Sequence, residues 1–281
     1  MVKLGSIAAF ALLSLAGEVF AEKKVKVMPF GASIVTRCWR NNLIAKLKNA
    51  GVTNYEMVGS QTGSANCVSQ FPGTENYNEG HPGSLATDYA RKGNLTRWLD
   101  AQPQVDVVIM ILGHNDILLG HKPIVDIMGA YDVLIQQMRT KNPNMQIIWS
   151  NLTPLDPAKW DTKSSPNNSK DLVALAAQIK NVATSKSTPE SPVRLVDTFD
   201  GYDPKADTVD GEHPNAIGNE KLAAKFFSAT KEAIEAASKA NTVSVASSSS
   251  STTTTTQQMK NPNVVNDFAN VVQQYIHDHK Q

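Results

Sequence analysis

Residues 25–39, VKVMPFGASIVTRCW, decide both the fold and the chemistry expected of this chain. The apolar run at 25–30 predicts a buried strand, and Gly31-Ala32-Ser33 predicts a tight turn at its end. Ligands of open α/β sheets collect at the carboxyl ends of strands, so we expect Ser33 to lie where chemistry occurs. A serine hydroxyl is a weak nucleophile unless a base takes its proton. Catalysis by Ser33 would therefore require a histidine, a carboxylate to orient it, and donors for an oxyanion elsewhere in the chain.

Strand and helix patterns alternate along the core. Residues 105–112, VDVVIMIL, are an almost unbroken apolar run, which is typical of a central parallel strand covered on both faces. Further strands are expected at 55–58, 145–150 and 193–196, and helices at 41–50, 85–99 with a break at Gly93, 124–139, 170–183 and from 216 to about 240. The alternation predicts a three-layer α/β/α sandwich built on a parallel sheet of five strands.

The ends of the chain differ in composition from this core. Residues 1–21 combine Lys3, a short apolar run and a small-residue cleavage site, which predicts a secretory signal peptide rather than a membrane span. We expect the folded domain at 22–240 and a Ser/Thr-rich linker at 241–262 that resembles O-glycosylated segments. Residues 263–281 have the pattern of one amphipathic helix, whose role the sequence does not identify.

Length and charge narrow the class of protein. A chain of 281 residues with 41% hydrophobic residues can bury one sizeable core. A net charge of +1 argues against a nucleic-acid partner, which favours a strongly basic face. After signal cleavage we expect a secreted, extracellular protein with no membrane segment, and a monomer, although nothing in the sequence decides the oligomeric state.

Secretion predicts two kinds of covalent modification, a disulfide and N-linked glycans. Cys38 and Cys67 are the two cysteines, and in an oxidising compartment they predict one disulfide that orders the glycine-rich loop at 59–82. N-x-S/T sequons begin at Asn94, Asn151 and Asn167. Asn167 lies in a polar loop and is expected to be the most accessible, whereas Asn151 follows a buried strand.

A histidine and a carboxylate occur together near the end of the core. His213 lies three residues after Asp210 in VDGEHPN, just before the last expected helix, which Asn215 should cap. A serine hydrolase needs an imidazole beside the hydroxyl, with its other nitrogen held by an acceptor. An isolated D-x-x-H is most often only a turn beside a helix start. Its combination with Ser33 favours a catalytic triad.

Two further residues are candidates for oxyanion donors. Asn115 follows the apolar strand and can donate from its side-chain amide. Gly83, in EGHPGSL, can donate its backbone N–H where a Cβ would obstruct a substrate. The alternatives are a turn asparagine and a turn glycine, and Gly80 is a rival for the role of Gly83.

Metal binding is another chemistry that residues in these loops could serve. The nearby candidates are His81, His114, Asp116 and His121. Their spacing matches no zinc template, so we interpret them as solvated loop residues and expect no metal.

In this order, the motifs resemble the four sequence blocks of the SGNH (GDSL-type) hydrolases. The blocks are Gly31-x-Ser33, Gly83, Gly113-x-Asn115-Asp116 and Asp210-x-x-His213. More narrowly, MPFGAS…CWR, NYEMVGS and EGHPGSL are similar to the family 3 carbohydrate esterases, which are secreted fungal and bacterial enzymes that deacetylate xylan. The resemblance runs from about residue 25 to about residue 238.

The resemblance implies a flavodoxin-like sheet and a role for each residue. It makes Ser33 the nucleophile, His213 the general acid and base, and Asp210 the residue that orients His213. It forms the oxyanion hole from the backbone N–H of Ser33, the N–H of Gly83 and the side chain of Asn115. This chemistry needs no metal or organic cofactor.

Two positions depart from the family pattern. Ala32 stands where the family usually has Asp, and His114 stands where Thr is frequent. The family's Asp helps to hold the turn of the nucleophile, so Ala32 calls the positioning of Ser33 into question. Neither change removes a group that must transfer a proton.

We therefore expect a serine esterase that removes O-acetyl groups from plant cell-wall polysaccharide, in particular acetylxylan, through an acetyl-enzyme on Ser33. One alternative is a lipase or lysophospholipase on the same fold. The other is a non-catalytic secreted carbohydrate-binding protein, for which Ala32 is the sole support. The sequence does not identify the acetylated sugar or its hydroxyl.

Overall fold

The computed structural model describes residues 23–62, 67, 76–102 and 104–249. The predicted signal peptide, residues 250–262 of the predicted linker and the predicted segment at 263–281 lie outside this part of the chain. Among the helices described, none combines the length and the apolar character needed to cross a bilayer.

A parallel sheet forms the centre of the molecule, with the strand order β2-β1-β4-β5-β6. These strands are β1 (Val25–Gly31), β2 (Tyr55–Met57), β4 (Val107–Ile111), β5 (Gln146–Ser150) and β6 (Val193–Val196). The five strands and their parallel pairing confirm the sheet predicted from the sequence. A two-residue strand, β3 (Glu79–Gly80), also pairs with β1 inside the segment that was expected to be loop.

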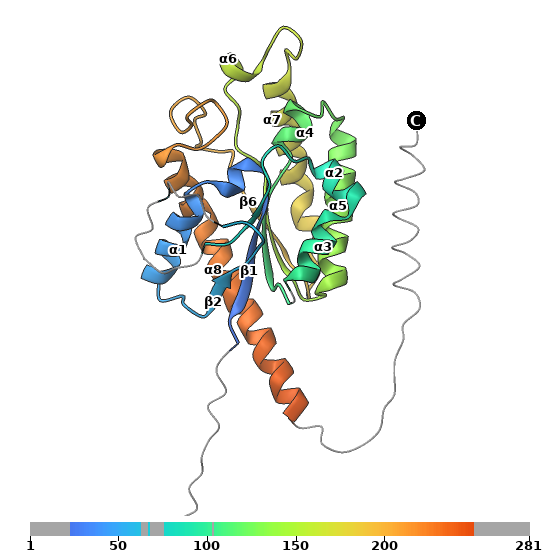
Figure 1. Cartoon of the computed structure of the whole chain (residues 1–281), viewed down its shortest axis with the longest axis vertical. Coiled ribbons are helices and arrows are strands. Elements are labelled where there is room, and N and C mark those ends of the chain that lie inside the picture. The colour runs from blue at the N-terminus through green and yellow to red at the C-terminus, as the bar shows by residue number, and fades with distance from the viewer. Residues whose placement is uncertain (1–22, 63–66, 68–75, 103, 250–281) are drawn as a thin grey trace, which may run out of the picture.

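Helices cover both faces of the sheet, as Figure 1 shows. One face carries α1 (Trp39–Asn49) and α8 (Ala216–Ser249), and the other carries α2 (Ala86–Lys92), α3 (Asn94–Ala101), α5 (Ile124–Lys141) and α7 (Asn168–Val182). Shorter elements are η1 (Ser33–Thr36), α4 (His114–Leu118), α6 (Pro157–Trp160) and η2 (Ala183–Lys186). The three-layer sandwich is therefore confirmed.

The central strands are buried along their whole length. Every residue of β4 and of β5 is buried, because helices pack on both sides of the sheet. Gly31 brings β1 close to β4: a Cβ at this position would lie 1.9 Å from the carbonyl oxygen of Ile111. A larger residue at Gly31 would therefore push the two strands apart at the end that carries Ser33.

Helix ends differ from expectation by a few residues, most of all in α8. The expected break at Gly93 is present, since Gly93 has a left-handed φ of 64° between α2 and α3. In contrast, α8 continues to Ser249, beyond the end expected near residue 240. Residues 241–249 contain no glycine or proline, and Ser, Thr and Val lower helix stability only modestly.

The disulfide between Cys38 and Cys67 is present, with a Cα–Cα distance of 5.2 Å. It joins the segment after η1 to residue 67, in the loop expected at 59–82. Arg40 adds a polar connection at the same place, because its buried guanidinium donates to the carbonyl oxygens of Val35 and Asn76. Burial lowers the pKa of Arg40 to about 10.

The three sequons differ in accessibility. Asn151 is buried and Asn167 is exposed, as expected from their neighbours, and Asn94 is half-buried. Whether any of them carries a glycan remains a prediction.

The strand order places a crevice between β1 and β4. The chain leaves β1 toward β2 and leaves β4 toward β5, in opposite directions along the sheet. In open α/β sheets such a reversal is where ligands bind. Ser33 follows β1 and Asn115 follows β4, so both lie at this crevice.

Candidate active site

Ser33 begins the single turn of η1 directly after β1. Its carbonyl oxygen accepts a hydrogen bond from Thr36 Oγ1 at 2.7 Å, which closes the turn. Ser33 is half-buried, and Ala32, the departure from the family pattern, is buried beside it. The turn therefore places the Ser33 hydroxyl at the rim of the sheet without an aspartate at position 32.

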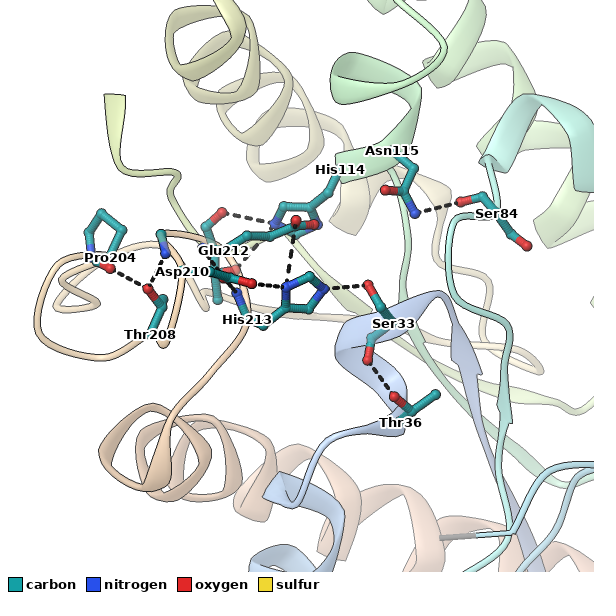
Figure 2. Close-up of polar contacts among 12 residues, drawn as sticks. Ser33, Thr36, Ser84, His114, Asn115, Pro204, Thr208, Asp210, Glu212 and His213 are labelled. Carbon is teal, nitrogen blue, oxygen red and sulfur yellow. Dashed lines mark hydrogen bonds and ion pairs between the residues drawn. The ribbon is translucent and has the colours of Figure 1, made fainter. Parts of the chain in front are cut away.

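The predicted histidine and carboxylate lie beside this hydroxyl (Figure 2). His213 Nε2 is 2.8 Å from Ser33 Oγ, and His213 Nδ1 is 2.7 Å from Asp210 Oδ2. The other carboxylate oxygen, Oδ1, accepts the backbone N–H groups of His213 and Glu212 at 2.8 and 3.1 Å. The structure therefore brings together all three residues that the sequence singled out, in one hydrogen-bonded row.

The row has a consistent set of protonation states. Burial raises the pKa of Asp210, but the hydrogen bonds from His213 and Glu212 lower it by more, and the pKa lies below its ordinary value. An ionised Asp210 accepts a hydrogen bond, so the Nδ1 of His213 that faces it carries a proton. In the neutral imidazole the other nitrogen, Nε2, is then an acceptor for the Ser33 hydroxyl.

The loop that carries His213 is held by its own polar residues. Thr208 Oγ1 donates to the carbonyl oxygen of Pro204 and accepts the N–H of Gly211 at 2.7 Å. Asn215 Oδ1 accepts the N–H groups of Ile217 and Gly218 at 2.9 and 3.1 Å, which confirms the predicted cap of α8. The loop is thus anchored on both sides of the histidine.

Gly83 lies in a turn whose geometry requires glycine. Ser84 N–H donates to the carbonyl oxygen of His81 at 3.2 Å, Pro82 is the second residue, and Gly83 has a φ of +81°. This is the pattern of a type II turn, with a left-handed third residue. A Cβ at Gly83 would meet no protein atom within 4 Å, so the backbone conformation, not crowding by the protein, favours glycine.

The structure distinguishes Gly83 from its rival. Gly80 N–H donates to Asn78 Oδ1 at 2.9 Å, so it is already engaged. Within the described residues, the Gly83 N–H has no acceptor. Gly83 is therefore the one of the two glycines that can offer a backbone donor.

Asn115 is buried at the start of α4 and is joined to the same turn. Its Nδ2 donates to the carbonyl oxygen of Ser84 at 3.1 Å (Figure 2). This bond orients the amide and uses one of its two N–H groups, which leaves the second for a ligand. The neighbouring Asp116 caps α2, because its carboxylate accepts the N–H groups of Ala86 and Thr87 at 2.7 and 3.0 Å.

Two of the four residues interpreted as solvated are buried instead. His114 and Asp116 are 4% and 0% exposed, since they lie in the first turn of α4 against the strand ends. His114 Nε2 lies 3.0 Å from the carbonyl oxygen of Thr153, and burial lowers the pKa of His114 to about 4. Burial also raises the pKa of Asp116 despite its hydrogen bonds.

The other two match the expectation better. His81 is half-buried and His121 is exposed. Across the described part of the chain, no three His, Cys, Asp or Glu side chains are grouped so that they could hold a metal ion.

A buried carboxylate that the sequence did not reveal supports the turn of Gly83. The Glu79 side chain is fully buried, accepts Ser60 N–H at 2.8 Å and pairs with His81 Nε2 at 2.6 Å. The His81 ring also stacks on Trp98, with 4.4 Å between ring centroids. Glu79 lies in a segment without strand alternation, so no sequence signal identified it.

A small cavity of about 10 Å³, roughly the space of one water molecule, lies beside the hydroxyl. Its walls are formed by Ala32, Ser33, Ile34, Ile111, Leu112, Gly113, His114, Asn115 and Glu212. The volume is below the range of roughly 300–1,000 Å³ typical of pockets for drug-sized ligands. The space enclosed beside Ser33 is therefore too small to hold a long acyl chain.

Comparison with known proteins agrees with this geometry. The model of the GDSL-like Lipase/Acylhydrolase family matches residues 30–221. A multidomain esterase from Ruminococcus flavefaciens is 25% identical over 240 residues, which are 77% of this chain and 30% of that protein. The chain thus spans less than a third of the length of that relative.

Solved structures of carbohydrate esterases are similar over the core. A carbohydrate esterase family 3 protein from Talaromyces cellulolyticus is 29% identical with a TM-score of 0.67, covering 75% of this chain and 98% of that one. The family 3 carbohydrate esterase of Clostridium thermocellum is 26% identical with a TM-score of 0.61, covering 76% and 98%.

Proposed function

Because the chain belongs to the GDSL-like lipase/acylhydrolase family and is similar to family 3 carbohydrate esterases, we propose that it is a carboxylic ester hydrolase that removes acetyl groups from plant cell-wall polysaccharide, in particular acetylxylan. The hydrogen-bonded row of Ser33, His213 and Asp210 carries this proposal. It supplies a nucleophile, a base and an orienting carboxylate within contact of one another.

Acylation begins at the Ser33 hydroxyl. Ser33 Oγ attacks the acetyl carbonyl carbon while His213 Nε2 takes its proton, and Asp210 stabilises the imidazolium that forms. The oxyanion of the tetrahedral intermediate accepts hydrogen bonds from the N–H groups of Ser33 and Gly83 and from the free N–H of Asn115. Collapse breaks the bond between the acyl carbon and the sugar oxygen, and His213 gives its proton to that oxygen, which leaves as a hydroxyl.

Deacylation repeats these steps with water. His213 takes a proton from a water molecule that attacks the acetyl-enzyme carbonyl, and the same donors stabilise the second oxyanion. Collapse releases acetate, and Ser33 recovers its proton from His213. Besides the ester and one water molecule, the cycle uses only side chains and backbone groups of this chain.

Two observations support a short acyl group on a carbohydrate. The cavity beside Ser33 is small, which favours acetyl over a fatty acyl chain. Two similar solved structures, at 29% and 26% identity, are family 3 carbohydrate esterases. The intact row of three side chains argues against the non-catalytic alternative.

We also propose that the enzyme is secreted. The signal peptide predicted at residues 1–21 motivates this, and a disulfide between Cys38 and Cys67 fits an oxidising compartment. Asn167 is the sequon we propose as a glycan acceptor, because it is exposed. Mass spectrometry of the protein recovered from a native culture medium checks cleavage and glycan attachment together.

The substrate proposal is tested with a panel of esters. Acetate release from acetylated xylan and hydrolysis of p-nitrophenyl acetate are measured for the wild type and for Ser33→Ala. We expect the wild type to act on both and the variant to lose at least about a thousandfold in rate. Activity on long-chain esters alone would contradict the acetyl assignment and favour the lipase alternative.

A further inference from the structure

A second carboxylate lies against His213, on the buried side of the imidazole. Glu212 Oε2 is 3.9 Å from His213 Nδ1, the same nitrogen that Asp210 holds at 2.7 Å. Figure 2 shows both carboxylates beside the ring. Glu212 also lines the small cavity next to Ser33, so it belongs to the site although the proposed mechanism gives it no role.

The two carboxylates differ sharply in their exposure to water. The side chain of Asp210 is 44% exposed, whereas that of Glu212 is 4% exposed. Water screens the charge of an exposed group, and a buried charge acts through a lower effective dielectric constant. At 3.9 Å, Glu212 is too distant for a hydrogen bond to Nδ1, so its effect on the imidazole is electrostatic.

The charged and titratable groups around Glu212 come from three segments. His213 and Asp210 lie on its own loop, Arg37 follows η1, and His114 lies across the cavity in α4. Burial raises the pKa of Glu212 and the charge of Asp210 raises it further, while His213 and Arg37 lower it. His114 is neutral near pH 7, because its pKa is about 4.

We propose that Glu212 is a positioning residue whose carboxylate stabilises the imidazolium form of His213. A buried carboxylate is costly unless a cation lies near it, and the imidazolium forms only while His213 carries the proton of Ser33. Glu212 therefore stabilises the transition state, in which the imidazole carries the proton, more than the resting state, in which it does not. This inference rests on the proposed function, since it assigns Glu212 to the same reaction.

The test removes the charge and keeps the shape, with Glu212→Gln. The control is Asp106→Asn, which removes another buried carboxylate, 5% exposed, at the opposite end of the sheet before β4. We measure the pH dependence of kcat/KM and, by NMR, the titration midpoint of the His213 ring. In Glu212→Gln we expect a fall in kcat of about tenfold at similar KM and a midpoint lower by roughly 0.5–2 pH units.

The conservative variant Glu212→Asp keeps the charge but shortens the side chain. We expect its midpoint to lie closer to the wild type than that of Glu212→Gln. Equal midpoints in the wild type, Glu212→Asp and Glu212→Gln would overturn the proposal, even if kcat fell in the variants. The NMR titration needs no turnover, so it still tests Glu212 if the wild type proves to have no esterase activity and the proposed function fails.

Discussion

His213 Nε2 lies 2.8 Å from the hydroxyl oxygen of Ser33, although the two residues are 180 positions apart in the chain. The helices that follow them hold this contact, because Trp39 N–H at the start of α1 donates to Asn219 Oδ1 in α8 at 2.9 Å. The distance between Nε2 and the hydroxyl is that of a hydrogen bond. The proton of Ser33 therefore has an acceptor without any rearrangement of the loop.

Replacing Asp210 with Asn should disable the histidine while preserving the loop. The amide oxygen can still accept the backbone N–H groups, but the amide N–H₂ would face His213 Nδ1 and favour the tautomer protonated on Nε2. We expect kcat on p-nitrophenyl acetate to fall by about 10²–10⁴-fold in Asp210→Asn. A loss of less than about threefold would show that Asp210 does not orient His213.

Removing the Asn115 amide should affect the transition state more than substrate binding. Asn115→Ala deletes one of the three proposed donors to the oxyanion, which is worth about 10²–10³ in kcat. We expect KM for p-nitrophenyl acetate to change by less than about threefold, because the oxyanion exists only after Ser33 has attacked the carbonyl. A rise in KM at constant kcat would instead assign Asn115 to substrate binding.

His114 should make the protein less stable in mild acid. Its pKa is about 4 in the folded protein, against 6.5 as the ordinary value. As the pH falls from about 6.5 to about 4, the unfolded chain binds a proton that the folded chain excludes, and stability is lost. Above 6.5 both forms are neutral and the contribution is constant.

The variant His114→Gln isolates this effect. Glutamine can still donate to the carbonyl oxygen of Thr153 but does not titrate. We expect urea unfolding between pH 7 and pH 4 to show a loss of free energy smaller by up to about 3 kcal/mol in His114→Gln than in the wild type. Parallel pH profiles for the two proteins would disprove the buried, neutral histidine.

The disulfide should contribute measurably to stability. Cys38 and Cys67 are 29 positions apart, and closing a loop of that length stabilises a protein by about 3–4 kcal/mol in the chain-entropy model. We expect Cys38→Ser combined with Cys67→Ser to lower the free energy of unfolding in urea by about 2–4 kcal/mol. The wild type treated with reductant is the matched comparison, and an unchanged midpoint in both would contradict the prediction.

The sheet and the row of three residues were predictable because their signals are local. Apolar runs such as residues 105–112 identify central strands, since burial on both faces excludes polar residues. Ser33 and the pair Asp210 and His213 each lie at an expected boundary between elements. Parallel topology alone then brings those boundaries to the same rim.

The remaining parts of the site depend on tertiary contacts that no local pattern reports. His114 was expected to be solvated and Glu212 carried no prediction, but packing over the strand ends buries both. The choice between Gly80 and Gly83 required knowing that Asn78 already accepts the Gly80 N–H. The length of α8 was missed because composition, not helix-breaking residues, had set its expected end.

The most direct test of the central claim is to find the acyl group on Ser33. Wild-type protein is mixed with excess p-nitrophenyl acetate, quenched in acid during turnover, digested and mapped by mass spectrometry. We predict an acetyl group on the peptide that contains Ser33, and none on that peptide in Ser33→Ala. Steady hydrolysis with no acetyl group on Ser33, or with the acetyl group on another residue, would contradict the account.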